Sequence, residues 1–241
     1  MEAPEYRTGG LLNIISTPIG NYADLTIRAY KALKNSEFII CEDTKESSKL
    51  LRFFEIKKEL RLLNEHNETD TAEEFITELL KGKIISLISD CGTPAFADPG
   101  LQLINRCNEL NIKLNFLPGA NSVLAAIVLS GFDISRFYYL GFLSPKTDIR
   151  KKELKEISKL NKTSVILDTP YKLKTVLKDI SEILAEREIF IGFDLTMETE
   201  KQLRGKANQI LEEIEKYSED KNLKGEFIIV INKQDDKHTE I

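Results

Sequence analysis

The 241-residue sequence has only three cysteines and two histidines. Cys41, Cys91 and Cys107 are scattered and form no CxxC pair, so neither a disulfide framework nor a zinc site is expected. His66 and His238 lie far apart in the sequence, which argues against a histidine-based metal centre, and we predict that no metal is bound. An odd number of cysteines without paired spacing is typical of proteins of the reducing cytoplasm.

Long apolar runs are also missing. No stretch approaches the ~20 apolar residues needed to cross a bilayer. The first ten residues, MEAPEYRTGG, include two acids and no apolar segment typical of a secretory signal. We therefore expect a cytoplasmic protein without membrane contact. Hydrophobic residues make up 41% of the sequence, which is enough to build a core and excludes a disordered chain.

Excess positive charge is absent from the chain as a whole, whose net charge is −5. This argues against a protein that coats nucleic acid non-specifically. The window from residue 146 to residue 178 is different, because it holds ten basic and four acidic side chains, a local net charge of +6. It is either a solvated helical face or a surface that faces phosphates. The candidate phosphate contacts are Lys146, Arg150, Lys151 and Lys172.

Short apolar runs alternate with amphipathic stretches along the chain. The runs predict strands at 11–16, 37–41, 83–89, 113–117, 136–142, 163–168, 188–193 and 225–232. The amphipathic stretches predict helices at 25–36, 45–55, 71–82, 101–110, 121–130, 150–160, 172–184 and 206–218, with Asp24 as the cap of the first. This alternation indicates an α/β protein with largely parallel sheets. The turn-forming pair Pro118-Gly119 suggests a boundary between two α/β domains, residues 1–118 and 119–241.

In such sheets ligands bind beyond the carboxyl ends of the strands, so the loops there are examined first. The loop after the first strand, Ser16–Asn21, is neither GxGxxG nor a Walker A loop, and its simplest interpretation is a tight turn. After the second strand, Asp43 either faces a cleft or caps the next helix. After the strand at 113–117, Pro118–Ser122 either attracts an anionic group to a helix N-terminus or only caps that helix.

The segment from Ser89 to Gly100 is the most informative loop. Ordinary connections between strands and helices have about two to six residues, and longer ones usually bind a ligand or act as a lid. Asp90 could accept hydrogen bonds from an ammonium or hydroxyl group. The backbone N–H groups of Gly92 and Thr93 could hold a carboxylate.

Together these loops resemble the tetrapyrrole-methylase superfamily, the class III S-adenosylmethionine (SAM) methyltransferases. Within it they are most similar to the branch that methylates the ribose 2′-hydroxyl of a cytidine in small-subunit (16S) ribosomal RNA. The matching stretches are TPIGNYADLTIRAYKAL (17–33), CEDTKESSKLL (41–51), NEHNE (64–68), SDCGTPAFADPG (89–100), PGANSVLAAIVLSGF (118–132) and GFLSPK (141–146). They follow the order of that branch and span residues 11–146 densely.

The resemblance implies two α/β domains with SAM in the cleft between them. By position it implies that the cofactor is bound by Pro18, Ser89, Asp90, Gly92, Thr93 and Ser122, and by Leu167, Thr169 and Thr196 after strands of the second domain. It implies 16S rRNA or the small ribosomal subunit as partner, with the basic window as an RNA track and Tyr138, Tyr139 and Tyr171 available for base stacking. By analogy with members of this fold, we expect a homodimer.

A ribose hydroxyl is a poor nucleophile, so a general base or hydrogen-bond acceptor would assist its attack. The candidates are Asp43, Glu65 and His66, although His66 is equally interpreted as a surface residue.

Two alternatives remain open. The sequence has Asp168-Thr169-Pro170-Tyr171-Lys172 where the family commonly has E-S-P-H-R, and Leu195-Thr196-Met197-Glu198 where it has L-T-K followed by E. Beyond about residue 233 it also lacks the further helical segment that longer members carry. One alternative is therefore a SAM enzyme that acts on a tetrapyrrole or other small molecule. The other is an RNA-binding paralogue that has lost catalysis.

Overall fold

The computed structural model describes residues 9–63, 68–216 and 225–234. The chain divides into two compact units, Met1–Asn121 and Ser122–Ile241. The boundary expected from the sequence at Pro118-Gly119 lies a few residues before this division. None of the helices in the described ranges is long and apolar enough to cross a membrane.

The first unit is built on a five-stranded sheet in the order β3-β2-β4-β1-β5, in which every pairing is parallel. The strands are β1 (Leu11–Ile15), β2 (Phe38–Cys41), β3 (Glu59–Leu62), β4 (Ile84–Ile88) and β5 (Lys113–Leu117). The helices are η1 (Tyr22–Asp24), α1 (Ile27–Asn35), α2 (Thr44–Phe53), α3 (Glu68–Leu80) and α4 (Leu101–Glu109). The parallel arrangement expected from the sequence is correct for this unit.

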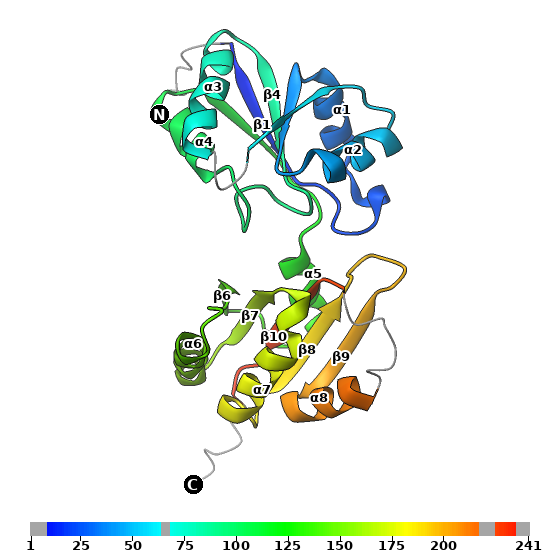
Figure 1. Cartoon of the computed structure of the whole chain (residues 1–241), viewed down its shortest axis with the longest axis vertical. Coiled ribbons are helices and arrows are strands. Elements are labelled where there is room, and N and C mark those ends of the chain that lie inside the picture. Colours follow the sequence, from blue (N-terminus) through cyan, green and yellow to red (C-terminus); the bar gives the residue numbers. More distant parts are fainter. Residues whose placement is uncertain (1–8, 64–67, 217–224, 235–241) are drawn as a thin grey trace. The chain divides into compact units, whose positions relative to one another are not determined.

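Helices cover both faces of the first sheet (Figure 1). Successive side chains of a strand point to opposite faces. Accordingly, Leu12 and Ile14 of β1 pack with α3 and α4, whereas Ile15 packs with α1 and α2. The cap of α1 is Thr26, whose hydroxyl accepts the Ala29 N–H, so the expectation that Asp24 caps this helix is wrong. Because these strands pair in parallel, the carboxyl ends of β1, β2, β4 and β5 lie at one edge of the sheet.

The second unit has a five-stranded sheet in the order β6-β7-β10-β8-β9. Its strands are β6 (Phe137–Phe142), β7 (Thr163–Asp168), β8 (Glu188–Phe193), β9 (Lys201–Lys206) and β10 (Phe227–Ile231). Its helices are α5 (Ser122–Ser130), α6 (Thr147–Lys159), η2 (Pro170–Lys172), α7 (Leu173–Ile183) and α8 (Ala207–Lys216). Helices α6, α7 and α8 pack on one face of the sheet, and α5 lies against β8 and β10.

The expectation of a largely parallel sheet is wrong for the second unit. Among the strands described in this unit, only β6 and β7 pair in parallel, because β10 is antiparallel to β7 and β8, and β9 is antiparallel to β8. The connection of residues 194–200 between β8 and β9 is too short for a parallel crossover and forms a hairpin. Strand β9 is not among the strands expected from the sequence, and it runs in the direction opposite to β8. Strand β10 has the same direction as β9, and it is therefore antiparallel to both of its neighbours, β7 and β8.

Candidate functional site

The loops after β1 and β4 are joined by hydrogen bonds at the carboxyl edge of the first sheet. The Thr17 N–H donates to the Gly92 carbonyl at 2.7 Å, and the Thr17 hydroxyl donates to the Ser89 carbonyl at 3.1 Å. The Ser89 hydroxyl also donates to the Gly92 carbonyl at 3.1 Å, and the hydroxyls of Ser16 and Thr93 lie 2.9 Å apart. These bonds bring together Pro18, Ser89, Asp90, Gly92 and Thr93, the first-unit residues predicted to bind the cofactor.

Two glycines allow this close packing of loops. Gly92 has φ +84°, a left-handed conformation that side chains rarely adopt. A Cβ on Gly119 would lie 3.0 Å from the Ser16 Cβ and 3.1 Å from the Ser16 carbonyl oxygen. The loop after β5 therefore approaches the loop after β1 at backbone contact distance.

The loops after β2 and β4 also bring carboxylates to this edge of the sheet. Asp43 caps α2 by accepting the Lys45 N–H at 2.6 Å, and its own N–H donates to Asp90 Oδ1 at 3.2 Å. Burial raises the pKa of Asp90, the Asp43 N–H lowers it, and the negative charges of Asp43 and Glu46 raise it further. The capping role considered for Asp43 is confirmed, and its catalytic role stays a prediction. The carboxylates of Asp43 and Asp90 therefore lie close together at this edge of the sheet.

Glu65 and His66, the other two candidate bases, lie outside the described residues. Cys41 ends β2 at the same edge, and burial raises the pKa of its thiol to about 11. The three cysteines are free thiols. Within the described ranges, no three His, Cys, Asp or Glu side chains gather as metal ligands would.

The carboxyl ends of β6, β7 and β8 form a corresponding edge in the second unit. Leu167, Thr169 and Thr196 lie at this edge, whereas Ser122 is the first residue of α5. Thr196 has φ +72°, a strained conformation for a β-branched residue. Backbone strain of this kind is concentrated at functional sites, so it favours a functional role for the turn that holds Thr196.

Asp168 ends β7 with a buried carboxylate. Its Oδ1 accepts the Thr169 N–H at 2.7 Å and lies 3.6 Å from the Lys172 ammonium. Its Oδ2 is buried and has no hydrogen-bond partner among the residues that the structure describes. Burial of a half-satisfied carboxylate costs stability, so this position is not explained by packing alone.

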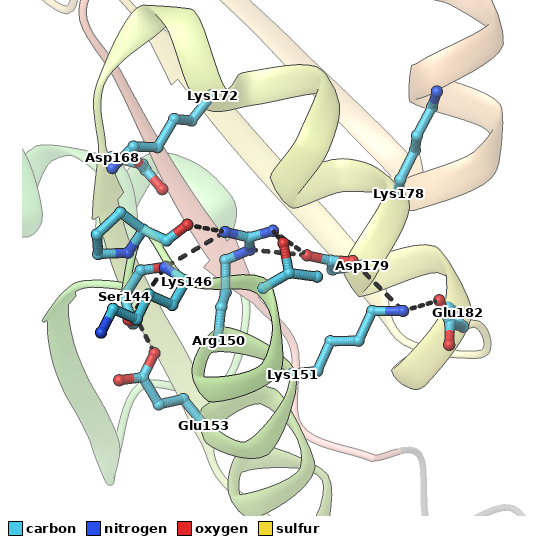
Figure 2. Close-up of polar contacts among 12 residues, drawn as sticks. Ser144, Lys146, Arg150, Lys151, Glu153, Asp168, Lys172, Lys178, Asp179 and Glu182 are labelled. Carbon is cyan, nitrogen blue, oxygen red and sulfur yellow. Dashed lines mark hydrogen bonds and ion pairs between the residues drawn. The ribbon is translucent and has the colours of Figure 1, made fainter.

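The basic residues predicted to contact RNA have different surroundings (Figure 2). Lys146 is exposed, and Lys172 is half-buried beside Asp168. Lys151 forms ion pairs with Glu182 at 2.5 Å and Asp179 at 3.8 Å. Next to Lys172, the Tyr171 side chain is 95% exposed.

Arg150 is only 2% exposed, and its guanidinium is bound to Asp179, so it cannot reach a phosphate. The prediction of an RNA contact is wrong for this residue. Asp179 was not singled out from the sequence. The available signal was its position among Val176, Leu177 and Ile180, which places it on the buried face of α7.

The chain is similar to known proteins over nearly its whole length. The family model described as Tetrapyrrole (Corrin/Porphyrin) Methylases matches residues 11–211. "Ribosomal RNA small subunit methyltransferase I" of Thermotoga maritima is 36% identical, with 92% of this chain and 98% of the relative covered. The protein of the same name from Buchnera aphidicola subsp. Schizaphis graminum is 39% identical, with 92% and 78% covered.

Among solved structures, diphthine synthase superposes with a TM-score of 0.73 at 12% identity, with 92% of this chain and 90% of that one covered, which is a likeness of fold. The α/β fold of this type, expected from the sequence, is confirmed. Since the family model covers most of the chain and relatives exceed 30% identity over 92% of it, the chain belongs to the tetrapyrrole (corrin/porphyrin) methylase family.

Proposed function

We propose that this protein is a SAM-dependent methyltransferase that methylates the ribose 2′-hydroxyl of a cytidine in 16S rRNA. The observation that carries the proposal is the match to relatives named for methylation of small-subunit rRNA, at 36% identity over 92% of the chain. The interlocked loops after β1 and β4 support it, because they are the segments that carry the resemblance and lie at the ligand-binding edge of a parallel sheet.

The groups at the first edge fit the chemistry of SAM. The cofactor carries two cations, the sulfonium and the α-ammonium, together with a carboxylate and ribose hydroxyls. Asp90, with the neighbouring carboxylate of Asp43, supplies negative charge for the cations. Backbone N–H groups at Gly92 and Thr93 suit the carboxylate, and the left-handed Gly92 leaves open space, since its Cβ would meet only Ile19 at 3.6 Å.

In this proposal the cofactor is held by the residues that the family resemblance implies. Bound SAM supplies a methyl group that is already activated by the sulfonium. The role of the chain is to align the acceptor hydroxyl with that methyl, and such alignment can account for ~7–11 kcal/mol of the barrier. The cofactor-binding set is Pro18, Ser89, Asp90, Gly92, Thr93 and Ser122, with Leu167, Thr169 and Thr196.

Activation of the ribose hydroxyl needs an acceptor for its proton, and Asp43, Glu65 and His66 remain the candidates. Asp43 is exposed at the edge of the first sheet, and its Oδ1 is engaged by the Lys45 N–H. That bond holds the carboxylate in a fixed orientation.

For the RNA we propose an interface at the carboxyl edge of the second sheet. Lys146 and Lys172 supply positive charge there, and Tyr171 supplies an exposed aromatic ring on which a base can stack. Lys151 is a weaker candidate because Glu182 and Asp179 already neutralise its charge. Loss of RNA affinity with added salt supports this interface, and salt-independent affinity refutes it.

We further propose that the protein acts in the cytoplasm as a homodimer. The free thiols are compatible with a reducing compartment. Size-exclusion chromatography with light scattering tests the dimer, because a mass of about 55 kDa is twice the 27.5 kDa of one chain.

The decisive experiment is methyl transfer from tritiated SAM to small ribosomal subunits from cells that lack the corresponding modification. Nuclease digestion and mass spectrometry then identify the product. We expect 2′-O-methylcytidine in 16S rRNA and no label in large subunits. SAM binding without label in either subunit favours a small-molecule substrate. RNA binding without SAM binding in calorimetry favours the non-catalytic paralogue.

A further inference from the structure

All three guanidinium nitrogens of Arg150 form hydrogen bonds inside the second unit. Nε and Nη2 each lie 2.7 Å from Asp179 Oδ2, and Nη1 donates to the carbonyls of Ser144 and Pro145, both at 3.2 Å. The remaining donor of Nη2 reaches the Thr147 hydroxyl at 3.3 Å. Figure 2 shows the guanidinium between α7 and the loop that precedes α6.

The loop Ser144–Lys146 is held at every backbone polar group. The Ser144 N–H donates to Glu153 Oε2 at 2.9 Å, and the Lys146 N–H donates to the Ser144 hydroxyl at 3.3 Å. The Lys146 carbonyl accepts the Arg150 N–H at 2.9 Å, and Arg150 binds the other two carbonyls. These hydrogen bonds hold the backbone of the loop in one conformation, and Lys146 within it is exposed.

Stability alone does not explain this buried ion pair. Removing two charges from water is costly, and a well-packed apolar pair of similar volume often stabilises a core equally well or better. An apolar pair, however, cannot bind the carbonyls of Ser144 and Pro145. What the arginine adds is therefore the fixed conformation of the loop.

The loop Ser144–Lys146 lies where a fixed conformation can serve ligand binding. Phe142, at the end of β6, pairs with Leu167 of β7, so the loop lies beside Asp168 and η2 at the ligand-binding edge. A second buried arginine, Arg187, precedes β8 at the opposite edge and donates to the carbonyls of Ser158 and Leu160 at the end of α6. These two hydrogen bonds close the end of α6 and do not involve the loop Ser144–Lys146.

We propose that Arg150 is a positioning residue for the substrate: together with Asp179 it fixes the loop Ser144–Lys146, so that the Lys146 ammonium meets a phosphate of the rRNA. This inference rests on the proposed function. It assigns the contact to Lys146 and gives Arg150 an indirect role.

The test compares three variants with the wild-type full-length chain in methyl transfer to small subunits. Lys146→Ala removes the contact, Arg150→Met with Asp179→Leu replaces the ion pair by an apolar pair, and Arg187→Met is the matched control. Lys146→Ala and the apolar pair should each raise KM for the subunit roughly tenfold, with the SAM affinity unchanged. Arg187→Met should lower the melting temperature and leave KM as in the wild type.

Combining Lys146→Ala with the apolar pair separates positioning from a general loss of structure. If Arg150 acts through Lys146, KM of the combined variant is no higher than KM of Lys146→Ala or of the apolar-pair variant alone. Lys146→Ala and the apolar-pair variant should each lower the slope of RNA affinity against salt by the equivalent of about one phosphate contact. Hydrogen exchange at the Ser144 and Lys146 amides should rise in the apolar-pair variant. A wild-type KM in that variant, or a full additional loss on Lys146→Ala, overturns the inference.

A failure of the proposed function would look different. In that case the wild-type protein itself would not label small subunits. The hydrogen-exchange comparison would still report whether Arg150 fixes the loop.

Discussion

Replacement of Gly92 by alanine separates the conformational requirement of the cofactor loop from its contribution to stability. Gly92 has φ +84°, and the left-handed conformation costs a non-glycine residue about 1–2 kcal/mol. Alanine also reduces the entropy of the unfolded chain, which offsets part of this cost, so we expect a net loss of about 1 kcal/mol. The melting temperature should fall by about 2–4 °C.

Gly82 supplies the matched control. It has φ +89° just beyond α3, and a Cβ there would meet nothing within 4 Å, so Gly82→Ala introduces nearly the same strain on an open surface. The two variants should therefore lose similar stability. They should differ in cofactor binding, since only the Gly92 carbonyl accepts the Thr17 N–H and the Ser89 hydroxyl.

Isothermal titration calorimetry with SAM measures the difference. If the loop relieves its strain by turning the Gly92 peptide, it loses hydrogen bonds worth about 1 kcal/mol each. We expect Kd for SAM to rise about tenfold in Gly92→Ala and to stay at the wild-type value in Gly82→Ala. Equal Kd values in the two variants would refute the assignment of this loop to the cofactor.

Three further predictions concern titratable groups. Folding raises the pKa of Asp90 above its ordinary value of 3.8, so ionisation of Asp90 lowers the stability of the folded protein as pH rises through this range. Asp90→Asn should therefore raise the melting temperature at neutral pH and lose that advantage in acid. The same variant should bind SAM more weakly in calorimetry. Alkylation by iodoacetamide at pH 8, followed by mass spectrometry, should label the partly exposed Cys91 first, and SAM should slow that labelling. Burial raises the pKa of Cys41 to about 11 and that of Cys107 to about 12, so about one in 1,000 or fewer of these two thiols is ionised at pH 8. His66→Ala should remove the limb of the pH–rate profile that reports deprotonation of the general base, if His66 is that base.

Each of these has an outcome that contradicts it. An Asp90→Asn variant less stable than the wild type at pH 7 would show that the carboxylate is held by favourable contacts. Labelling of Cys91 at the same rate with and without SAM would place the cofactor away from the loop. An unchanged pH–rate profile would remove His66 from the candidates.

The apolar pattern of the sequence predicts most of the first unit, because its central strands are buried on both faces and read as continuous apolar runs. Strands β3 and β9 were missed for the opposite reason. Their sequences, ELRL and KQLRGK, are polar, and both strands lie at the edges of their sheets. Edge strands are commonly protected from unwanted pairing by charged side chains, which removes the apolar signal.

The candidate site was predictable where loops follow buried strands, and less so where burial decides the role of a charged residue. Composition places Arg150 in a basic window, but its spacing to Leu154 and Ile157 places it on the apolar face of α6. A charge at such a position is buried and needs a partner. Only the fold shows that Asp179 of α7 is that partner, because the two residues are 29 positions apart in the sequence.

The two sheet edges differ in sign and in how they are held. The first is fixed by neutral hydroxyls and backbone groups around carboxylates, which suits a cationic cofactor. The second presents Lys146, Lys172 and Tyr171 on a loop and a short helix braced by buried charges, which suits an anionic polymer. Because charge at each edge is matched to one ligand, substitutions at the first should change Kd for SAM and leave the salt dependence of RNA binding unaltered. Substitution of Lys146 or Lys172 at the second edge should do the reverse, and a variant that changes both together would mean that the two ligands do not bind independently.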